Sequence, residues 1–444
     1  MTEEADRLEV RVTIREAPAE LRLVWIGGTM SRLDSCACKQ NVRFAHSAAL
    51  LRRLAKGPPR TALIDAGGAL DGDSPLDRER QRVYAAILKD LPFSAFAVGG
   101  GRGFLTADLQ SSLAAAGPPL LTIGGLPVTL ALGGRSLSVV CADSPPEPPP
   151  GMRVAPAGPK PPVWGHPDAA AQAAAAVAPL KGRGDLVVLT GDLSREDVAR
   201  IAALPAPPDL VLTGRPLAAS RLLTDERTRV VYEDPMEPVG PLLLFGTSSS
   251  SFGGIRYVDL GADGAPVAYG MFQIAQKIEL DARTSDQVEA FMRRIAEDPS
   301  LAGPAPRRFA SEPRENDPTD GYVGKDACLK CHEPQARQWS STPHGSATKV
   351  LENMDRHYYP GCITCHSTGY GYPTGYSPRD ANAAALRDVG CETCHGPGRR
   401  HSASPEEEGL IRRGSPSICA ECHDGRDAKP LGDRLKEAYE KLRH

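Results

Sequence analysis

The sequence lacks three features that would each point to a class of protein. It has no run of about 18 or more uncharged apolar residues, which excludes a membrane-spanning helix of ordinary length. It also lacks a charge bias, because 52 Lys and Arg stand against 55 Asp and Glu, so it predicts neither nucleic-acid binding nor a polybasic membrane patch. Its first seven residues, MTEEADR, carry no basic, apolar and small-residue pattern of a secretory signal.

Length and composition indicate a loop-rich protein of more than one domain. The chain has 444 residues, which exceeds what one hydrophobic core usually serves. Hydrophobic residues make up 41%, enough for a packed core, while 41 prolines and 44 glycines imply many turns and interrupted elements.

The first two thirds of the chain alternate between short apolar runs and helix-like stretches. This alternation predicts an α/β layered sandwich. Buried strands are expected at 21–26, 61–64, 95–98, 136–140, 186–190, 209–213 and 241–245, and helices at 44–55, 77–90, 168–180, 194–203 and 284–297.

A polar, proline-rich segment follows the last of these helices. Residues 298–319, DPSLAGPAPRRFASEPRENDPT, contain too few apolar side chains to form a core, so we interpret them as an interdomain linker. The domains are then expected at 20–297 and 320–444.

Cysteine and histidine are concentrated beyond this linker. Eight of the 11 cysteines and eight of the 10 histidines lie in the final 124 residues, and the pattern CxxCH occurs there four times. Chance would supply roughly 0.01 copies in the whole chain, from the product of the residue frequencies. The motifs are Cys328–Cys331–His332, Cys362–Cys365–His366, Cys391–Cys394–His395 and Cys419–Cys422–His423.

The spacing of this motif suits covalent haem attachment. Two thiols separated by two residues form thioethers to the two vinyl groups of one haem, and the adjacent histidine reaches the iron as proximal ligand. We therefore expect four haems c. Zinc sites also use CxxC pairs but do not require a histidine after each one, and a disulfide framework would leave the histidines unexplained.

Four further histidines in this region are candidates for the second axial position. His344, His401 and His444 are expected to be distal ligands, because histidine or methionine usually completes a six-coordinate c-type haem. His357 could be a ligand, a residue beside an open iron or a solvated side chain. Met354 could substitute for it.

Residues 321 to 432 resemble the tetrahaem cytochrome c-554 family, whose members accept electrons from hydroxylamine oxidoreductase. The resemblance extends beyond CxxCH to YVGKDAC at 322–328, TPHG at 342–345, CHSTGY at 365–370 and VGCETCHGPG at 389–398. It implies a mostly α-helical multihaem cytochrome c domain with bis-histidine ligation at most irons and low reduction potentials. It also implies that histidines such as His344, His401 and His444 are distal ligands.

Residues 20–280 resemble the 5′-nucleotidase-like metallophosphatases, in a subgroup with a CxC element here represented by Cys36 and Cys38. The metal ligands of that family are absent at the matching positions, so phosphatase activity is not expected. Those positions hold Gly27–Thr29, Gly68, Gly99–Gly101, Gly191 and Arg215, and His46 and His166 are the histidines of the domain. Cys36 and Cys38 could form a redox or metal pair or a disulfide with Cys141, or they could be incidental thiols.

The resulting hypothesis is an electron-transfer protein in which a non-catalytic phosphatase-like domain docks a partner or shields the haems. Its expected partners are redox proteins, with no nucleic acid and no integral membrane segment. The alternative is a reductase of a small nitrogen-oxide-type substrate at a five-coordinate iron. The resemblance to c-type cytochromes implies a periplasmic or other extracytoplasmic location.

Overall fold

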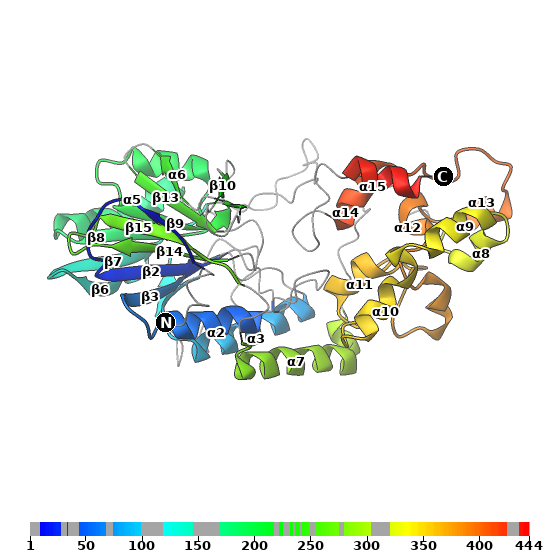
Figure 1. The fold of residues 1–444 in the computed structure, drawn as a ribbon, viewed down its shortest axis with the longest axis horizontal. Coiled ribbons are helices and arrows are strands. Elements are labelled where there is room, and N and C mark those ends of the chain that lie inside the picture. The colour runs from blue at the N-terminus through cyan, green and yellow to red at the C-terminus, as the bar shows by residue number, and fades with distance from the viewer. Residues whose placement is uncertain are drawn as a thin grey trace. The chain divides into compact units, whose positions relative to one another are not determined.

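A computed structural model describes two compact units of the chain (Figure 1). One comprises Met1–Asp73 and Asp77–Gln287, and the other Ser74–Leu76 and Val288–His444. Within the described part, no helix has the length and apolar character needed to span a membrane. The described residues are 9–27, 33, 44–67, 74–98, 119–144, 168–216, 222–224, 231–233, 236–239, 242–247, 254–274, 279–302, 320–423 and 435–443.

The first unit contains a seven-stranded sheet in which four neighbouring strands run parallel. Strands β2 to β5 form this parallel part, while β14 is antiparallel to both β2 and β15. All six residues of β2 and of β14 are buried. The order is β1 (Glu9–Thr13), β15 (Pro266–Phe272), β14 (Ile255–Leu260), β2 (Leu21–Ile26), β3 (Arg60–Asp65), β4 (Phe93–Val98) and β5 (Leu120–Thr122).

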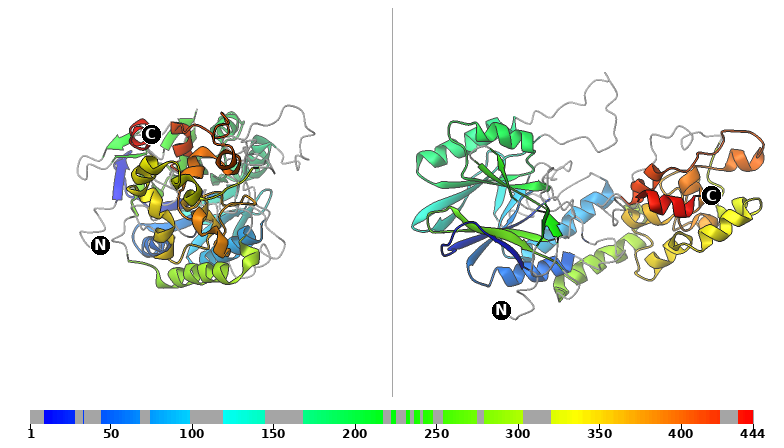
Figure 2. Two further views of the ribbon diagram at one scale, coloured as in Figure 1. Left: turned by 90° about the vertical axis from the view of Figure 1, so that its right-hand side faces the viewer. Right: turned by 45° about the horizontal axis from the view of Figure 1, so that its top comes forward.

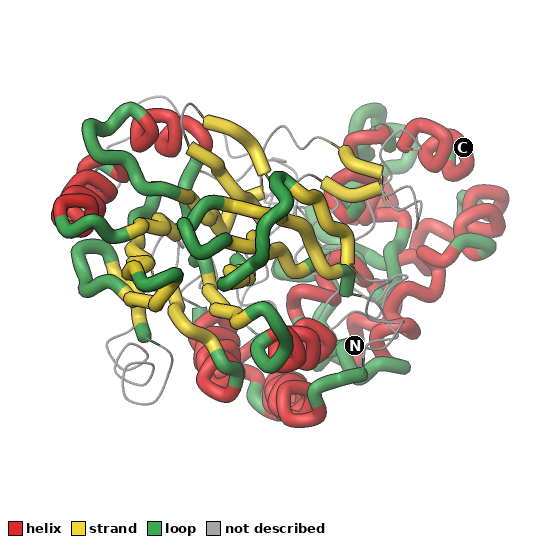
Figure 3. The backbone as a smooth tube through the Cα atoms, turned by 60° about the vertical axis from the view of Figure 1, so that its left-hand side comes forward, coloured by secondary structure: helices red, strands yellow, loops and turns green. Residues whose placement is uncertain are grey.

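A six-stranded sheet faces it and shares its core. Four central strands are parallel, and an antiparallel strand closes each edge. The order is β12 (Met236–Val239), β13 (Leu242–Thr247), β9 (Leu210–Pro216), β8 (Leu186–Gly191), β7 (Arg135–Cys141) and β6 (Val128–Leu132), and β10 (Leu222–Thr224) pairs separately with β11 (Val231–Glu233). Figure 3 shows the strands in yellow, gathered in this unit.

Helices cover the outer faces of the two sheets. α5 (Ala169–Gly182) and α6 (Arg195–Ala202) lie on the outer side of the six-stranded sheet (Figure 2). Their apolar side chains pack on β8, β9 and β13. Asp168 and Ser194 cap these two helices by accepting hydrogen bonds from the first-turn amides. α2 (Phe44–Leu54) and α3 (Pro75–Asp90) lie on the side of the seven-stranded sheet. The predicted α/β layered sandwich is confirmed.

The second unit is helical and has a small aromatic core. Tyr322, Tyr370, Tyr372 and Tyr376 surround the fully buried Ile363. The helices are the end of α7 (Ala282–Glu297), η1 (Pro299–Leu301), α8 (Lys325–Leu329), α9 (Glu333–Ser340), η3 (Pro343–Ser346), α10 (Ala347–Glu352), α11 (Pro360–His366), η4 (Ala381–Leu386), α12 (Cys391–His395), α13 (Arg399–Ala403), α14 (Pro416–Cys422) and α15 (Leu435–Leu442). The predicted helical fold is confirmed.

The end of α7 belongs to this helical unit. Arg356, 3% exposed, donates two hydrogen bonds to the carboxylate of Glu289, at 2.7 and 3.1 Å. Arg379 donates to the carbonyl oxygens of Ile295 and Ala296 in the last turn of α7, where carbonyl oxygens lack partners within the helix. The division between the units therefore falls ten residues before the predicted linker at 298. Residues 303–319 of that linker lie outside the described residues, and its boundaries stay a prediction.

Candidate functional site

Each CxxCH motif lies on or beside a short helix. The second motif ends α11, the third is α12, and the fourth ends α14 with His423 directly after it. The first motif joins α8 to α9, with His332 immediately before α9. In a helical turn the residues at positions i, i+3 and i+4 share one face, so the two thiols and the imidazole of a motif point the same way.

Two motif histidines face a distal candidate. The ring centres of His332 and His401 are 6.2 Å apart, and those of His344 and His423 are 6.4 Å apart. Two imidazoles bound to opposite sides of one metal ion would have centres about 6 Å apart, because each metal–nitrogen bond is about 2 Å long and the ring centre lies about 1 Å beyond the nitrogen. These two pairs therefore fit bis-histidine ligation.

The other two motif histidines, His366 and His395, are oriented by contacts of Nδ1, the ring nitrogen that would not bind the metal. Nδ1 of His366 lies 2.9 Å from the carbonyl oxygen of Ala347, and Nδ1 of His395 lies 2.9 Å from that of Arg412. A carbonyl accepts only a proton, so it selects the tautomer that carries hydrogen on Nδ1. Nε2 then keeps its lone pair, which is the arrangement of metal-binding histidines with a supporting hydrogen bond.

Burial favours the neutral form of His344. Loss of hydration lowers the pKa of this imidazole below its ordinary value, and the neighbouring His423 and His366 lower it further. A neutral imidazole is the form that ligates a metal.

The remaining candidate residues either lie apart from the two histidine pairs or fall outside the described residues. The ring of His357 packs on Tyr358, with centres 4.4 Å apart, and burial lowers its pKa. Its Nδ1 is buried and makes no hydrogen bond within the described part of the chain. Cys141 is buried with a free thiol at the end of β7. His444, Cys36, Cys38 and His166 lie outside the described residues.

Two buried acidic residues of the motif region were missed by the sequence analysis. Asp388 accepts a hydrogen bond from the Thr348 amide at 2.9 Å and pairs with Lys325 at 3.2 Å. Glu392, between the two cysteines of the third motif, is 3% exposed and accepts hydrogen bonds from backbone amides. The available signal was its position between two cysteines predicted to bind haem, because a carboxylate that is buried there needs a partner.

In the first unit, the described residues at the ends of the parallel strands include a polar cluster of Asp143, Asp192 and Arg215. Asp192 pairs with Arg215 at 2.8 Å, and its amide donates to Asp143 Oδ1 at 2.7 Å. Gly191 lies against the neighbouring strand so closely that a β-carbon would sit 1.9 Å from the Ala142 carbonyl oxygen. Among the positions at which the sequence lacks the metal ligands of the metallophosphatases, the structure describes Gly27, Gly191 and Arg215. No group of three or more His, Cys, Asp or Glu suited to a metal ion occurs among the described residues.

We expect the stability of this unit to fall as pH rises from about 4 to 8. Burial raises the pKa of Asp65 to about 7, although Gly67 and Tyr84 donate hydrogen bonds to it, and burial raises the pKa of Asp143 to about 7. In the folded state both carboxyls are therefore mostly protonated below about pH 7. The contribution of the two carboxyls to the free energy of unfolding is complete below the pKa that they have in the unfolded chain. It is lost as the pH rises through the pKa that they have in the folded chain, by roughly 3 to 4 kcal/mol for each group.

Asp143→Asn tests this expectation, because asparagine keeps the acceptor for the Asp192 amide and cannot ionise. The free energy of unfolding, measured in urea at pH 5 and pH 8, should differ less in this variant than in the parent. Asp263→Asn is the control, since Asp263 is exposed and ion-paired with Arg15. An unchanged pH dependence in Asp143→Asn would contradict the assignment.

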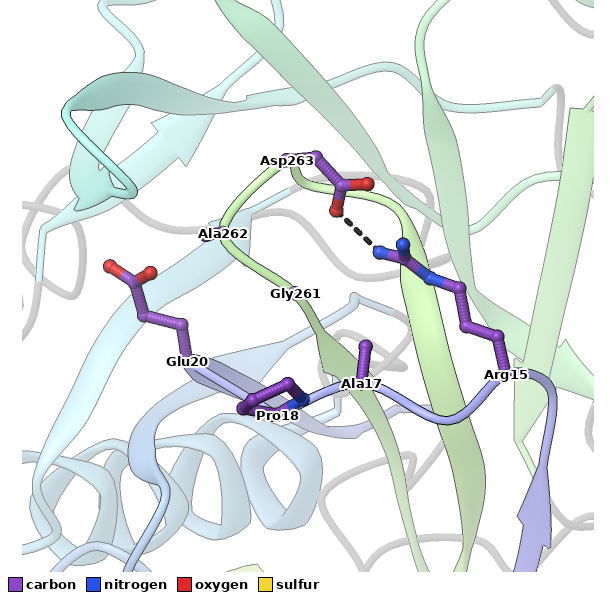
Figure 4. A pocket seen from close by; sticks show the side chains of 7 residues that line it. All are labelled: Arg15, Ala17, Pro18, Glu20, Gly261, Ala262 and Asp263. Atoms are coloured by element: carbon purple, nitrogen blue, oxygen red, sulfur yellow. Dashed lines mark hydrogen bonds and ion pairs between the residues drawn. The ribbon is translucent and has the colours of Figure 1, made fainter.

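A shallow depression of about 300 Å³ lies elsewhere on the first unit (Figure 4). The guanidinium of Arg15 is engaged there by Asp263 at 2.5 Å and by the Ala265 carbonyl oxygen at 3.2 Å. We assign it no role. Its lining residues are Arg15, Ala17, Pro18, Glu20, Gly261, Ala262 and Asp263.

Comparisons with known proteins agree with the predicted resemblance at the C-terminal end. Residues 327–396 match the family model described as cytochrome c554 and c-prime. Cytochrome c-554 of Nitrosomonas europaea is 30% identical over 103 residues, which are 20% of this chain and 43% of that protein. The chain thus spans less than half the length of this curated relative. The predicted resemblance to cytochrome c-554 is confirmed.

Solved structures resemble the α/β part of the chain. A 5′-nucleotidase precursor from Thermus thermophilus is 14% identical with a TM-score of 0.44, covering 62% of this chain and 59% of that one. The sulfate thiohydrolase SoxB of Thermus thermophilus, in complex with glycerol, is 12% identical with a TM-score of 0.44, covering 63% and 62%. The NAD nucleotidase of Haemophilus influenzae is 15% identical with a TM-score of 0.43, covering 65% and 61%.

Proposed function

We propose that this chain transfers electrons through four haems c bound to its C-terminal region. The cytochrome c554 match supports a multihaem cytochrome with an electron-transfer role. The observation that carries the finer proposal is the approach of two motif histidines to two distal histidines at ring separations of 6.2 and 6.4 Å. Haem iron, when bound, supplies the reversible ferric–ferrous couple, and two neutral imidazoles favour a lower potential than histidine with methionine.

The motif cysteines would hold the haems through thioethers, and histidines would ligate the irons. His332 with His401, and His423 with His344, are the proposed axial pairs. His366 and His395 are proposed as proximal ligands, supported by the carbonyl oxygens that orient their rings. The attachment cysteines are Cys328, Cys331, Cys362, Cys365, Cys391, Cys394, Cys419 and Cys422.

We assign His444 to the iron of the third motif. The helix before it, α15, lies against Gly414, whose carbonyl oxygen accepts a hydrogen bond from Tyr439 at 2.7 Å. A β-carbon at Gly414 would lie within 4.0 Å of both Tyr439 and His395, so α15 is a neighbour of the third motif. This proximity supports the assignment. His357 remains unassigned to an iron.

The small core of the helical unit supports the same proposal. Four tyrosines and a few aliphatic residues form it, although the described part of that unit exceeds 100 residues. A segment of that size with so little buried apolar side chain usually needs covalent or metal cross-links. Haems bound through thioethers would supply both the cross-links and the missing apolar volume.

The α/β unit is proposed to dock a redox partner protein or shield the haems, without phosphatase activity. Its strand ends present glycine and the Asp192–Arg215 ion pair where a metal centre would need ligands. We further propose an extracytoplasmic, periplasmic setting, because covalent attachment of haem to CxxCH takes place there in bacteria.

A reductive titration of protein matured in a host that assembles c-type haem tests the proposal. We expect four electrons to be taken up per chain and carbon monoxide to leave the reduced spectrum unchanged at the bis-histidine irons. Uptake of no electrons, with a colourless chain, would refute the proposal. Rapid oxidation of the reduced protein by a nitrogen oxide, together with carbon monoxide binding, would instead favour the reductase alternative.

A further inference from the structure

The Glu392 side chain joins two segments that are distant in the sequence. Its Oε1 accepts hydrogen bonds from the amides of Gly398 at 2.8 Å and Val323 at 3.0 Å. Its Oε2 accepts from the amide of Gly324 at 2.7 Å and, more weakly, from that of Val323 at 3.2 Å. The residue is 3% exposed, so water does not compete for these donors.

Both segments lead directly into a proposed ligand of the same iron. Gly324 precedes α8, which carries the first motif toward His332. Gly398 precedes α13, which contains His401. Neither short helix has a side-chain cap from its own N-cap residue, so the Glu392 carboxylate accepts amide protons at the start of both.

The backbone around the carboxylate leaves little freedom. Gly324 has a φ of +84°, and a β-carbon there would lie 2.6 Å from the Ala385 β-carbon. The Arg399 amide donates to the Gly321 carbonyl oxygen at 3.0 Å, which ties α13 to the chain before α8 a second time. A shift of either segment would therefore be transmitted to the histidine that follows it.

We propose that Glu392 is a positioning residue for the haem of the first motif, holding His332 and His401 at the separation that one iron requires. This inference rests on the proposed function. Glu392, a residue of the third motif, would thus set the ligand geometry at the iron of the first motif, acting through the two backbone segments that it holds. An iron–imidazole bond depends steeply on distance, so misplacement of Gly398 would detach His401 first.

Glu392→Gln and Glu392→Asp in the full, haem-loaded chain test the role. Glutamine matches the shape but turns an amide NH₂ toward backbone donors, and aspartate keeps the charge but shortens the reach. Glu421→Gln is the matched control, because Glu421 lies in the fourth CxxCH motif and is exposed. Haem content is measured first, then the low-spin and high-spin signals by electron paramagnetic resonance, then the reduction potentials.

Both Glu392 variants should convert one haem from low spin to high spin and raise its potential, and added imidazole should restore the low-spin signal. Loss of the first motif's haem alone, located by peptide mass mapping, would support the role as well. Parent-like spectra and potentials in both variants would overturn it. So would a raised potential in Glu392→Gln with a parent-like spectrum in Glu392→Asp, because Glu392 would then act by charge. A parent chain without haem would overturn the proposed function at the first measurement.

Discussion

We expect replacement of both cysteines of one CxxCH motif by serine to lower the haem content of the chain from the proposed four to three. Cys362→Ser with Cys365→Ser is the example, and each of the other three pairs should give the same result. The thioethers hold the haem during maturation and afterwards, so an imidazole alone retains it poorly. The measurement is the pyridine haemochrome absorbance per chain, combined with the intact mass of the protein.

Cys141→Ser is the control for this series. Cys141 is buried in β7 of the α/β unit and lies outside the four motifs, so its replacement should leave four haems. A parent chain with a haem count other than four, or a paired cysteine variant that keeps the parent's count, would contradict the proposal. Zinc released in place of haem would favour the tetrahedral thiolate alternative.

Removal of a distal histidine should open one iron. In His401→Ala, the ring 6.2 Å from His332 is lost, so the reduced protein should bind about one equivalent of carbon monoxide more than the parent, and one low-spin signal should disappear. The potential of that haem should rise, because an electron-donating imidazole no longer stabilises the ferric iron. Optical titration with carbon monoxide and a potentiometric titration measure the two effects.

His357→Ala is the comparison for this prediction. The ring of His357 packs on Tyr358, so we expect its removal to create no carbon monoxide site. If His357→Ala binds carbon monoxide and His401→Ala does not, the proposed axial pairs are wrong. If neither variant does, the distal ligands lie elsewhere.

The parallel strands of both sheets except β5 could be predicted from local sequence, whereas the antiparallel strands were missed. Strand β8 is a nearly continuous apolar run, and β2 is apolar apart from Arg22, as expected for strands with both faces covered. β14 was missed because its sequence, IRYVDL, includes two charged residues. Asp259 is fully buried there and pairs with Arg22 of β2 at 2.6 Å, and such a pair becomes visible only when the two strands lie side by side.

The four CxxCH motifs need no tertiary structure to be found. Both thiols and the proximal histidine of each lie within five residues, so local spacing is sufficient to predict a haem for each motif. Local spacing cannot assign a distal histidine to a particular iron, because any of the four candidate histidines could in principle reach any iron.

The folded chain was needed to propose the axial pairs His332 with His401 and His423 with His344, and to propose the role of Glu392. These residues lie far apart in the sequence, and their distances depend on how α8, α12, α13 and α14 pack and on which backbone amides meet a buried carboxylate. Ligand type is a property of single residues and can be read along the chain. Coordination geometry is a relation between distant residues, so it is decided by packing.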